Sequence, residues 1–482
     1  MKRYEQLADD LASSIRTGAM KLGDRLPSVR QVSTSRGVSA STVFEAYYLL
    51  EARGLVRARE RSGYFVTAGA TSLPPEPDIE SGFDTASLPV EVSELVFSVL
   101  ESVKTRSVVP LGSAFPSPLL FPLPRLARSL AYGARMMDPW TTVDDITPGN
   151  ADLRRQIALR YLADGVLVTL DDIVITNGAL EALNLCLQVV AKPGDSVVVE
   201  SPTFYGALQA LENLGLKAIE VPANPRDGID MGMLAQVLEI HKPAACWLMT
   251  SFQNPLGSLM PDEKKRALVN LLAAHAVPLI EDDVYGELYF GKKRPLPAKA
   301  FDQDGMVLHC SSFSKSLAPG YRLGWAIPGR FRQSVSRLKL MRTLAVAAPV
   351  QEGIADYLAK GGYDRHLRQL RHALSQQQIS LASAVLRHFP LGTRATRPEG
   401  GYFMWVELPK GIDTLALQCE ANALDISIAP GPMFSARAAF KNCVRLNYGH
   451  PWTPAFDTAV ATLGRLANVQ QAKAKAAAEP GR

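Results

Sequence analysis

The sequence predicts two unlike folded parts: a large α/β domain with a mostly parallel central sheet and, before it, a small winged helix-turn-helix. Two observations predict them. In the body of the chain, buried strands end in polar residues before helices begin, and the first 66 residues follow a helix-turn-helix-hairpin pattern. The chain has 482 residues, and its 47% hydrophobic content is enough for two or three domains with large cores.

Three helices and a hairpin are predicted in the N-terminal part. Apolar residues recur at helical spacing over residues 4–15, and Ser28 and Ser39 are good N-caps for a second and a third helix. Residues 55–59 and 62–66 alternate like the two strands of a hairpin. Helices followed by a basic hairpin are typical of a winged helix-turn-helix.

The charge of this part indicates a nucleic-acid partner. Residues 1–66 contain eleven lysines and arginines and seven acids, a net charge of +4 out of +5 for the whole chain. The excess lies at helix starts and on the hairpin, where phosphates would be met. Because Arg57, Arg59 and Arg61 crowd the hairpin, Gly63 is left free to enter a narrow groove. A solvated basic face is the alternative interpretation.

A lysine in a serine-rich turn is the strongest chemical signal in the larger part. Lys315 closes the run Ser311-Ser312-Phe313-Ser314-Lys315, and Arg322 follows seven residues later. The amine can form a Schiff base with an aldehyde cofactor. The serines and Arg322 can hold a phosphate on that cofactor, the arginine by a charge-assisted fork.

A second polar group precedes this turn. Residues 277–287 read as a short buried strand ending in acids and a tyrosine, and the carboxyl ends of strands are where open α/β sheets bind ligands. Asp282 would keep a pyridine nitrogen protonated there, which makes the ring a stronger electron sink. Tyr285 and Asn254 can both donate a hydrogen bond to a phenolate oxygen on the same ring.

Together these motifs resemble the active site of fold-type I aminotransferases, which use pyridoxal 5'-phosphate (PLP). The matching motifs are Asn254-Pro255-x-Gly257, Asp282-x-x-Tyr285 and Ser312-x-x-Lys315 with Arg322, and the resemblance runs from about residue 108 to about residue 468. It implies an aminotransferase-like domain with a small α+β C-terminal subdomain. It also implies Lys315 as the catalytic residue and a set of cofactor-binding residues: Gly178, Ala179, Leu180, Phe204, Asn254, Asp282, Tyr285, Ser312, Lys315 and Arg322.

The resemblance departs from the family pattern at residues 179–180 and leaves alternatives open for two other residues, Phe204 and Arg445. Ala179 and Leu180 stand where the family often has a serine and a glutamine, which leaves backbone donors but removes a side-chain donor from the phosphate. Phe204 is the predicted aromatic shelf for the cofactor ring, with Tyr205 as the alternative. Arg445 lies in an apolar strand, so it has either a protein carboxylate partner or awaits one from a ligand. By the resemblance it grips the substrate carboxylate, with Asn254 beside it.

The first 66 residues resemble the GntR-type DNA-binding domain. The resemblance rests on Arg25-Leu26-Pro27-Ser28-x-Arg30, Val38-Ser39-x-Ser41-Thr42-Val43 and Ser62-Gly63-Tyr64. A recognition helix would present its N-terminal residues to the major groove of double-stranded DNA. The implied DNA-binding residues are Arg25, Ser28, Arg30, Ser39, Ser41, Thr42, Arg59 and Gly63.

A winged helix fused to an aminotransferase-like domain resembles the MocR subgroup of GntR-type transcriptional regulators. The implied function is a regulator that binds an operator, holds PLP as an aldimine on Lys315 and senses an amino acid or amine effector, as a homodimer. Slow or partial transamination at most is expected of it. The alternative is a catalytically active PLP-dependent aminotransferase with an accessory DNA-binding domain.

The predicted domains are the winged helix (1–67), a Pro/Gly-rich linker (68–92), the aminotransferase-like domain (93–470, small subdomain about 345–470) and a flexible tail (471–482). Five dispersed cysteines and seven scattered histidines predict neither a disulfide framework nor a metal site. No signal segment or membrane span is evident, so we expect a cytoplasmic protein, associated with the nucleoid when bound to DNA.

Overall fold

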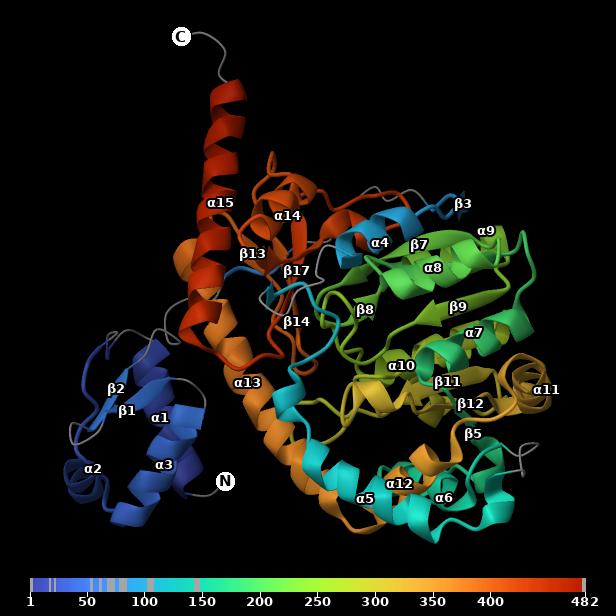
Figure 1. Cartoon of the computed structure of the whole chain (residues 1–482). Helices are drawn as coiled ribbons and strands as arrows, with labels where there is room; N and C mark the ends of the chain where they lie inside the picture. The colour runs from blue at the N-terminus through green and yellow to red at the C-terminus, as the bar shows by residue number, and fades with distance from the viewer. Residues whose placement is uncertain are drawn as a thin grey trace.

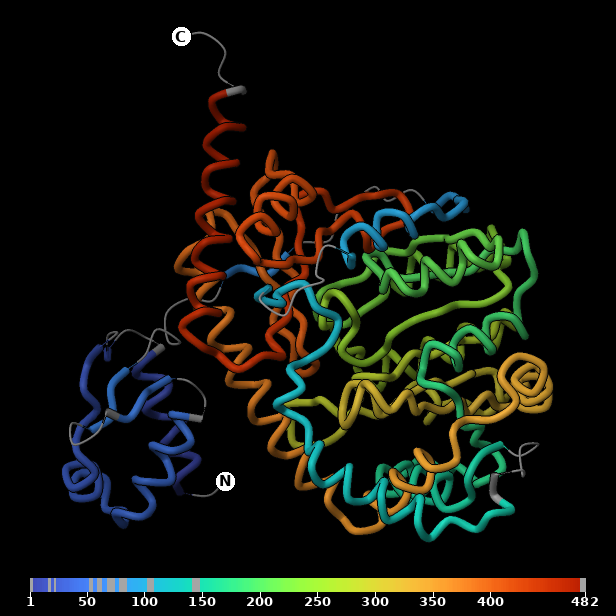
Figure 2. Tube along the Cα trace, viewed as in Figure 1, coloured from blue at the N-terminus to red at the C-terminus, as the bar shows by residue number. Residues whose placement is uncertain are grey.

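A computed structural model describes residues 3–16, 19–20, 23–52, 55–59, 63–66, 74–77, 85–101, 108–142 and 148–478. Figure 1 shows a small N-terminal group of elements, in blue, beside a larger body built on a twisted sheet. The same path can be followed in the tube of Figure 2, in which helix α15 leaves the body toward the C-terminus. The predicted fold class is confirmed.

The N-terminal part is the predicted winged helix-turn-helix. Ser28 caps the second helix, because its Oγ accepts from the Gln31 amide at 3.3 Å, and Gly37 ends that helix in the left-handed region at φ 61°. The hairpin pairs Val56 with Val66 in antiparallel register. The elements are α1 (Arg3–Arg16), α2 (Val29–Arg36), α3 (Ala40–Ala52), β1 (Val56–Arg59) and β2 (Gly63–Val66).

The large body contains a nine-stranded sheet in the order β3-β7-β6-β9-β10-β11-β12-β5, with β8 beside β7. The neighbours from β7 to β11 are parallel, whereas β12 is antiparallel to both of its neighbours and β3 is antiparallel to β7. Its strands are β3 (Leu88–Pro89), β5 (Val174–Thr176), β6 (Ser196–Ser201), β7 (Lys217–Asn224), β8 (Gly228–Ile229), β9 (Ala245–Leu248), β10 (Leu279–Asp282), β11 (Val307–Ser312) and β12 (Gly324–Ile327).

Helices cover both faces of this sheet. Val197 and Val199 of β6 belong to one hydrophobic cluster and Val198 between them belongs to another, as expected for a strand buried on both sides. The helices of the large body are α4 (Ser93–Glu101), α5 (Leu123–Met136), α6 (Ala151–Ala163), α7 (Ala179–Val190), α8 (Tyr205–Asn213), α9 (Met231–His241), α10 (Asp262–Ala274), α11 (Arg332–Thr343) and α12 (Ala348–Ala359).

The C-terminal part forms a smaller α+β subdomain. Its antiparallel sheet has the order β13-β14-β17-β16, and β15 pairs in parallel with β4 from the start of the large body. The elements are α13 (Gly362–His388), α14 (Thr414–Asn422), α15 (Pro454–Ala478), β4 (Val109–Pro110), β13 (Arg394–Ala395), β14 (Phe403–Glu407), β15 (Ile426–Ser427), β16 (Ala429–Pro430) and β17 (Cys443–Asn447). Helix α15 therefore runs into the segment for which a flexible tail was predicted.

Part of the predicted linker packs against the body. The Pro75 carbonyl accepts from the Ala395 amide at 2.9 Å, and the Pro74 carbonyl accepts from Arg397 at 3.1 Å. Glu76 forms an ion pair with Arg226. Of the rest of the linker, residues 68–73 and 78–84 lie outside the described residues, whereas residues 85–92 are described and include strand β3 at the edge of the large sheet. No helix among those that the structure describes is long and apolar enough to cross a bilayer.

Candidate functional site

One edge of the large sheet collects most of the predicted cofactor residues. Strands β5, β10 and β11 end at this edge and β12 begins there, because Asp282 pairs with Cys310, while Gly324 pairs with both Ser312 and Thr176. The turns that follow the strands therefore lie next to one another. This is the edge at which open α/β sheets bind ligands.

Lys315 lies in the turn after β11. Its Nζ donates to the Ala114 carbonyl at 3.0 Å and lies 3.9 Å from the centroid of the Phe115 ring. Burial lowers the pKa of Lys315 to about 7; the positive charges of Arg445 and Arg322 act in the same direction, and Asp282 opposes them. A lysine with such a pKa supplies a neutral, nucleophilic amine near neutral pH.

The lowered pKa of Lys315 gives a pH prediction. Only the neutral amine attacks an aldehyde, so the rate constant for capture of free PLP by the cofactor-free protein should rise through pH 7 and level off above about pH 8. A lysine of ordinary pKa near 10.4 would show the rise some three units higher. Stopped-flow absorbance from pH 5.5 to 9.5 measures it, and a rate still climbing steeply at pH 9.5 would contradict the prediction.

Asp282, at the end of β10, is a buried acid with an unused oxygen. Burial raises the pKa of its carboxyl to about 7, the neighbouring Asp283 adds to this rise, and Lys315 opposes it. Within the described residues, Oδ1 has no hydrogen-bond partner. Buried acceptors are normally paired, so this oxygen is suited to a donor on a ligand.

Arg445 was predicted either to pair with a protein carboxylate or to await one from a ligand. It is 1% exposed, and its guanidinium donates to Asn254 Oδ1 at 3.1 Å and to the Gly112 carbonyl at 2.6 Å. It lies over the rings of Phe403 and Phe434, at 4.2 and 5.3 Å from their centroids. Among the described residues no carboxylate forms an ion pair with it. Its buried charge is therefore available to a ligand carboxylate.

The turn between β5 and α7 forms a cradle. Gly178 has φ 86° and ψ 171°, a backbone conformation that favours glycine, and it lies directly beside the Arg322 guanidinium. Helix α7 begins at Ala179, and its first amides have no partner within the helix. In the facing turn, Ser312 Oγ accepts from the Ser314 amide at 3.3 Å, while the Ser314 hydroxyl has no partner in the described part of the chain. These groups suit a phosphate.

The two candidate aromatic residues have different surroundings. Tyr205 is buried, and its ring centroid lies 5.9 Å from that of Phe434. Burial raises the pKa of its hydroxyl, and the positive charge of nearby Arg445 opposes this rise. Phe204 is only half-buried and lies 4.9 Å from Tyr205. Tyr205 is thus committed to the Arg445 cluster, and Phe204 remains the predicted shelf for the ring. Tyr285 is buried against Tyr402, 5.4 Å between ring centroids.

Sequence reasoning missed the segment 112–115, which contacts both cations of the site. Besides the bonds from Lys315 and Arg445, its carbonyls accept from Asn447 Nδ2, at 2.9 Å for Ser113 and 2.8 Å for Phe115. The one local signal was Gly112, where a Cβ would lie 2.5 Å from the backbone of Ile428. The segment acts through carbonyl groups, which every residue has, so its side chains do not reveal it.

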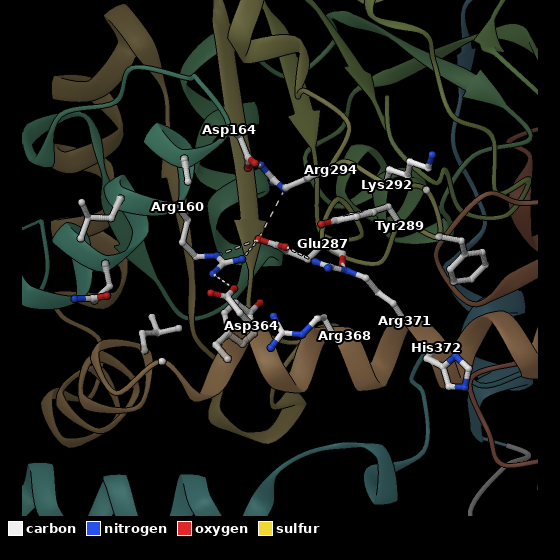
Figure 3. Close-up of a pocket in the computed structure, with 18 of the residues that line it drawn as sticks. Arg160, Asp164, Glu287, Tyr289, Lys292, Arg294, Asp364, Arg368, Arg371 and His372 are labelled. Atoms are coloured by element: carbon white, nitrogen blue, oxygen red, sulfur yellow. Dashed lines mark hydrogen bonds and ion pairs between the residues drawn. The ribbon is translucent and has the colours of Figure 1, made fainter. Parts of the chain in front are cut away.

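A separate cavity of about 790 Å³ lies between α6, α13 and residues 287–294. Figure 3 shows Glu287 there between Arg160, Arg294 and Arg371. The carboxylate accepts from Arg160 at 2.9 Å and from Arg371 at 3.2 Å, and Arg294 Nε lies 3.7 Å away. Burial alone would raise the pKa of Glu287, but the three guanidiniums hold it below its usual value. None of the predicted cofactor residues lines this cavity.

Removal of the Glu287 charge should destabilise the large body. The variant Glu287→Gln leaves three guanidiniums around a neutral group, and the free energy of unfolding should fall by ~3 kcal/mol. Asp364→Asn is the matched control. Asp364 also binds Arg160, at 2.9 Å, but is 65% exposed, so its loss should cost less than ~1 kcal/mol. Urea unfolding followed by tryptophan fluorescence measures both, since all five tryptophans lie after residue 139. Equal effects would contradict the prediction.

The predicted DNA-contact residues cluster at the second and third helices and the wing. Ser39 Oγ lies 2.8 Å from the hydroxyls of both Ser41 and Thr42 at the start of α3. At Gly63, which has φ 97°, a Cβ would lie 3.2 Å from Arg25 Nε, so the wing approaches that arginine closely. Arg30 is exposed on α2. The side chain of Arg59, and Arg61 and Ser62, lie outside the described residues.

Comparisons with known proteins support the predicted family of both the winged helix and the large body. Residues 118–453 match the family model for aminotransferase class I and II, and residues 3–66 match that for bacterial regulatory proteins of the gntR family. An uncharacterized HTH-type transcriptional regulator of Escherichia coli (strain K12), YdcR, is 46% identical over 466 residues, 97% of this chain and 99% of that protein. The chain belongs to the MocR subgroup of GntR-type regulators.

Aminotransferases also resemble this MocR-type regulator over most of its length. Aromatic-amino-acid aminotransferase 1 of Thermococcus litoralis is 30% identical over 78% of this chain and 91% of that enzyme. LysN, an alpha-aminoadipate aminotransferase from Thermus thermophilus, was solved with N-(5'-phosphopyridoxyl)-L-leucine. It matches with a TM-score of 0.70 and 28% identity, over 80% of this chain and 100% of that one.

PLP is the cofactor of this family, and the site fits it. Asp282 Oδ1 and Asn254 Nδ2 both lack a hydrogen-bond partner in the part of the chain that the structure describes. The first matches a protonated pyridine nitrogen, and the second matches the phenolate oxygen of the ring. The glycine cradle at 178, with Arg322 and the Ser314 hydroxyl, matches the phosphate. The side chains of Ala179 and Leu180 have no hydrogen-bond donor. At these two positions the phosphate can therefore be bound only by backbone amides.

Proposed function

We propose that this MocR-type regulator binds an operator through residues 3–66 and that an amino acid or amine, captured at the PLP site, changes that binding. One observation carries the proposal. The buried Arg445 guanidinium, which has no carboxylate partner in the described part of the chain, lies in the same site as Lys315. A cation held ready for a ligand carboxylate, in a chain that also carries a winged helix, favours a sensor of amino acids.

The residues of the site support this chemistry. When bound, PLP supplies an aldehyde that captures amines and a ring that withdraws electrons. Lys315 would hold the cofactor and, once displaced by the effector amine, could take or return a proton at the effector Cα. Arg445 and Asn254 would orient the effector through its carboxylate, and Asp282 would hold the proton on the pyridine nitrogen.

The contacts of the linker support a route from the site to the winged helix. Residues 74–77 bind the small subdomain through Ala395 and Arg397, and bind the large body through Arg226. Residues 74–77 follow the wing in the sequence and precede both the large body and the small subdomain. A ligand that favours one arrangement of the large body and the small subdomain would therefore change the contacts of residues 74–77. Coupling requires only that the effector bind the two arrangements with different affinity.

A working aminotransferase is the second candidate, and the near-neutral pKa of Lys315 favours it. An amine that titrates near pH 7 is well suited to proton transfer. Slow or partial transamination is also consistent with a regulator. Steady turnover of an amino acid with 2-oxoglutarate at ~1–10³ s⁻¹ would favour the enzyme.

The operator and effector are proposed to act on a homodimer in the cytoplasm. Large apolar side chains remain exposed on α5 and just after it, namely Tyr132, Met136 and Trp140, and a partner subunit would cover such a surface. Paired winged helices match operators with two half-sites. Light scattering of the full-length protein tests the dimer. When bound to a duplex operator, the protein would be associated with the nucleoid.

Binding to the DNA upstream of the protein's own coding sequence tests the regulatory function. We expect tighter binding than to random DNA at matched salt, and a loss of about tenfold in Arg30→Ala. Arg36→Ala is the matched control on the same helix, because the Arg36 guanidinium already pairs with Asp10 at 3.2 Å. Addition of the effector should shift the affinity of the wild type. Equal affinity for the upstream and random DNA would contradict the proposal.

A further inference from the structure

Two aromatic side chains on α3 are not used by the core of the winged helix. Phe44 and Tyr48 are 44% and 57% exposed, and their rings stack 6.5 Å apart at an interplanar angle of 29°. The opposite side of the helix is buried through Val43, Ala46, Tyr47 and Leu50. Because residues four apart share a helix face, the two rings form one outward surface, which we call the aromatic pair.

The aromatic pair connects the start of α3 to the wing. Phe44 follows the hydroxyl-bearing residues Ser39, Ser41 and Thr42 at the start of α3. Burial raises the pKa of Tyr64 on β2, and the nearby Tyr48 adds to this rise. The Tyr64 ring in turn packs edge-on to buried Tyr47, 5.1 Å between centroids. Tyr48 therefore lies between the wing and Phe44, and its ring stacks on that of Phe44.

The surroundings of the pair favour a polar groove as its partner. Ser41 and Glu45 are exposed beside Phe44, and exposed Arg25 and Arg57 belong to the wing side of the domain. A protein-binding patch usually spans several hundred Å² of contiguous apolar surface; two rings bordered by hydroxyls and charges do not. The major groove of DNA has this mixture, since its one apolar group is the thymine C5-methyl among base donors and acceptors.

We propose that Phe44 reads thymine methyl groups in the major groove and that Tyr48 positions its ring. The inference rests on the proposed operator binding and adds a base preference to it. The N-terminal residues of a recognition helix contact base edges, and Phe44 is the fifth residue of α3. A phenylalanine has no donor or acceptor, so it distinguishes thymine from cytosine through the methyl group alone.

Replacement of thymine by deoxyuridine tests the inference, because it removes only that methyl. Full-length, PLP-loaded protein is used to select duplexes from a random pool, and each thymine of the selected site is then replaced in turn. At one or two positions per half-site the affinity should fall about fourfold, the value of one buried methyl. In Phe44→Ala the same replacements should change affinity by less than about 1.5-fold.

Two further variants separate the parts of the claim. Tyr48→Phe keeps the ring and should keep the thymine preference. Phe97→Ala removes an exposed phenylalanine of α4, in the other domain, and should behave like wild type. Circular dichroism checks that Phe44→Ala stays folded, as expected for a side chain outside the core.

The possible failures can be told apart. If the wild type selects a sequence but deoxyuridine has the same effect in wild type and Phe44→Ala, the inference is wrong while operator binding stands. The inference is also wrong if Phe44→Ala keeps the thymine preference but loses self-association in light scattering. If the wild type selects nothing above random DNA, operator binding itself fails, and the inference with it.

Discussion

Lys315→Ala should give a colourless protein that retains no PLP after borohydride reduction and dialysis. The wild type should be yellow, and reduction should leave one phosphopyridoxyl group attached at residue 315. The reason is that the amine held near the Ala114 carbonyl is the one amine that the site offers to the aldehyde among the described residues. Any half-transamination should also fall by ~10²–10⁴, the usual contribution of a general acid–base. Absorbance and peptide mass spectrometry measure these outcomes.

Lys292→Ala is the matched control for this experiment. Lys292 is exposed on the rim of the separate Glu287 cavity, so its loss should leave colour and adduct unchanged. A yellow Lys315→Ala protein, or a reduced adduct on another lysine of the wild type, would overturn the assignment of residue 315.

Arg445→Gln should separate ligands that have a carboxylate from those that do not. Affinity for an α-amino acid should fall by about 10- to 100-fold, the worth of a charge-assisted pair of ~1.5–3 kcal/mol, because the ligand carboxylate loses its cation. Affinity for the decarboxylated amine of the same side chain should change less than about threefold. Titration of the PLP absorbance with both ligands measures the difference.

The amine serves as the control for structural damage. Arg445 also holds Asn254 and the Gly112 carbonyl, so a variant that disturbs the site as a whole would weaken both ligands equally. Equal losses would therefore assign Arg445 a structural role and remove the main support for an amino acid effector.

The fold of the winged helix was predictable because its signals are local. Ser28 caps α2 and Gly37 ends it, and the alternation of residues 63–66 sets which side chains of the wing face the core. The strand before Asp282 was predictable for a similar reason, since a short apolar run bounded by polar residues is consistent with a buried strand. The packing of residues 74–77 on the body was not predictable, because its partners lie about 150 and 320 residues away in sequence.

The candidate site was predicted through its side chains and missed where it uses backbone. Asp282, Lys315 and Arg445 were found from residue type and spacing. The carbonyls of residues 112–115 bind the same cations, yet the residues that supply them have no chemical signature. Two of the arginines around Glu287 were missed because Arg160 on α6 and Arg371 on α13 lie 127 and 84 residues from it in sequence and reach it only in the folded chain.

The order of residues along the chain was sufficient to predict the chemistry of this protein: a lysine for an aldehyde, an acid for a pyridine, and a basic helical domain for a DNA duplex. Each follows from the properties of a side chain and its immediate neighbours. Only the tertiary structure decided that Arg445 is buried without a carboxylate partner among the described residues and that Phe44 and Tyr48 face outward. Burial and pairing are set by contacts between segments far apart in sequence, and these contacts determine the charge and surface offered to a ligand.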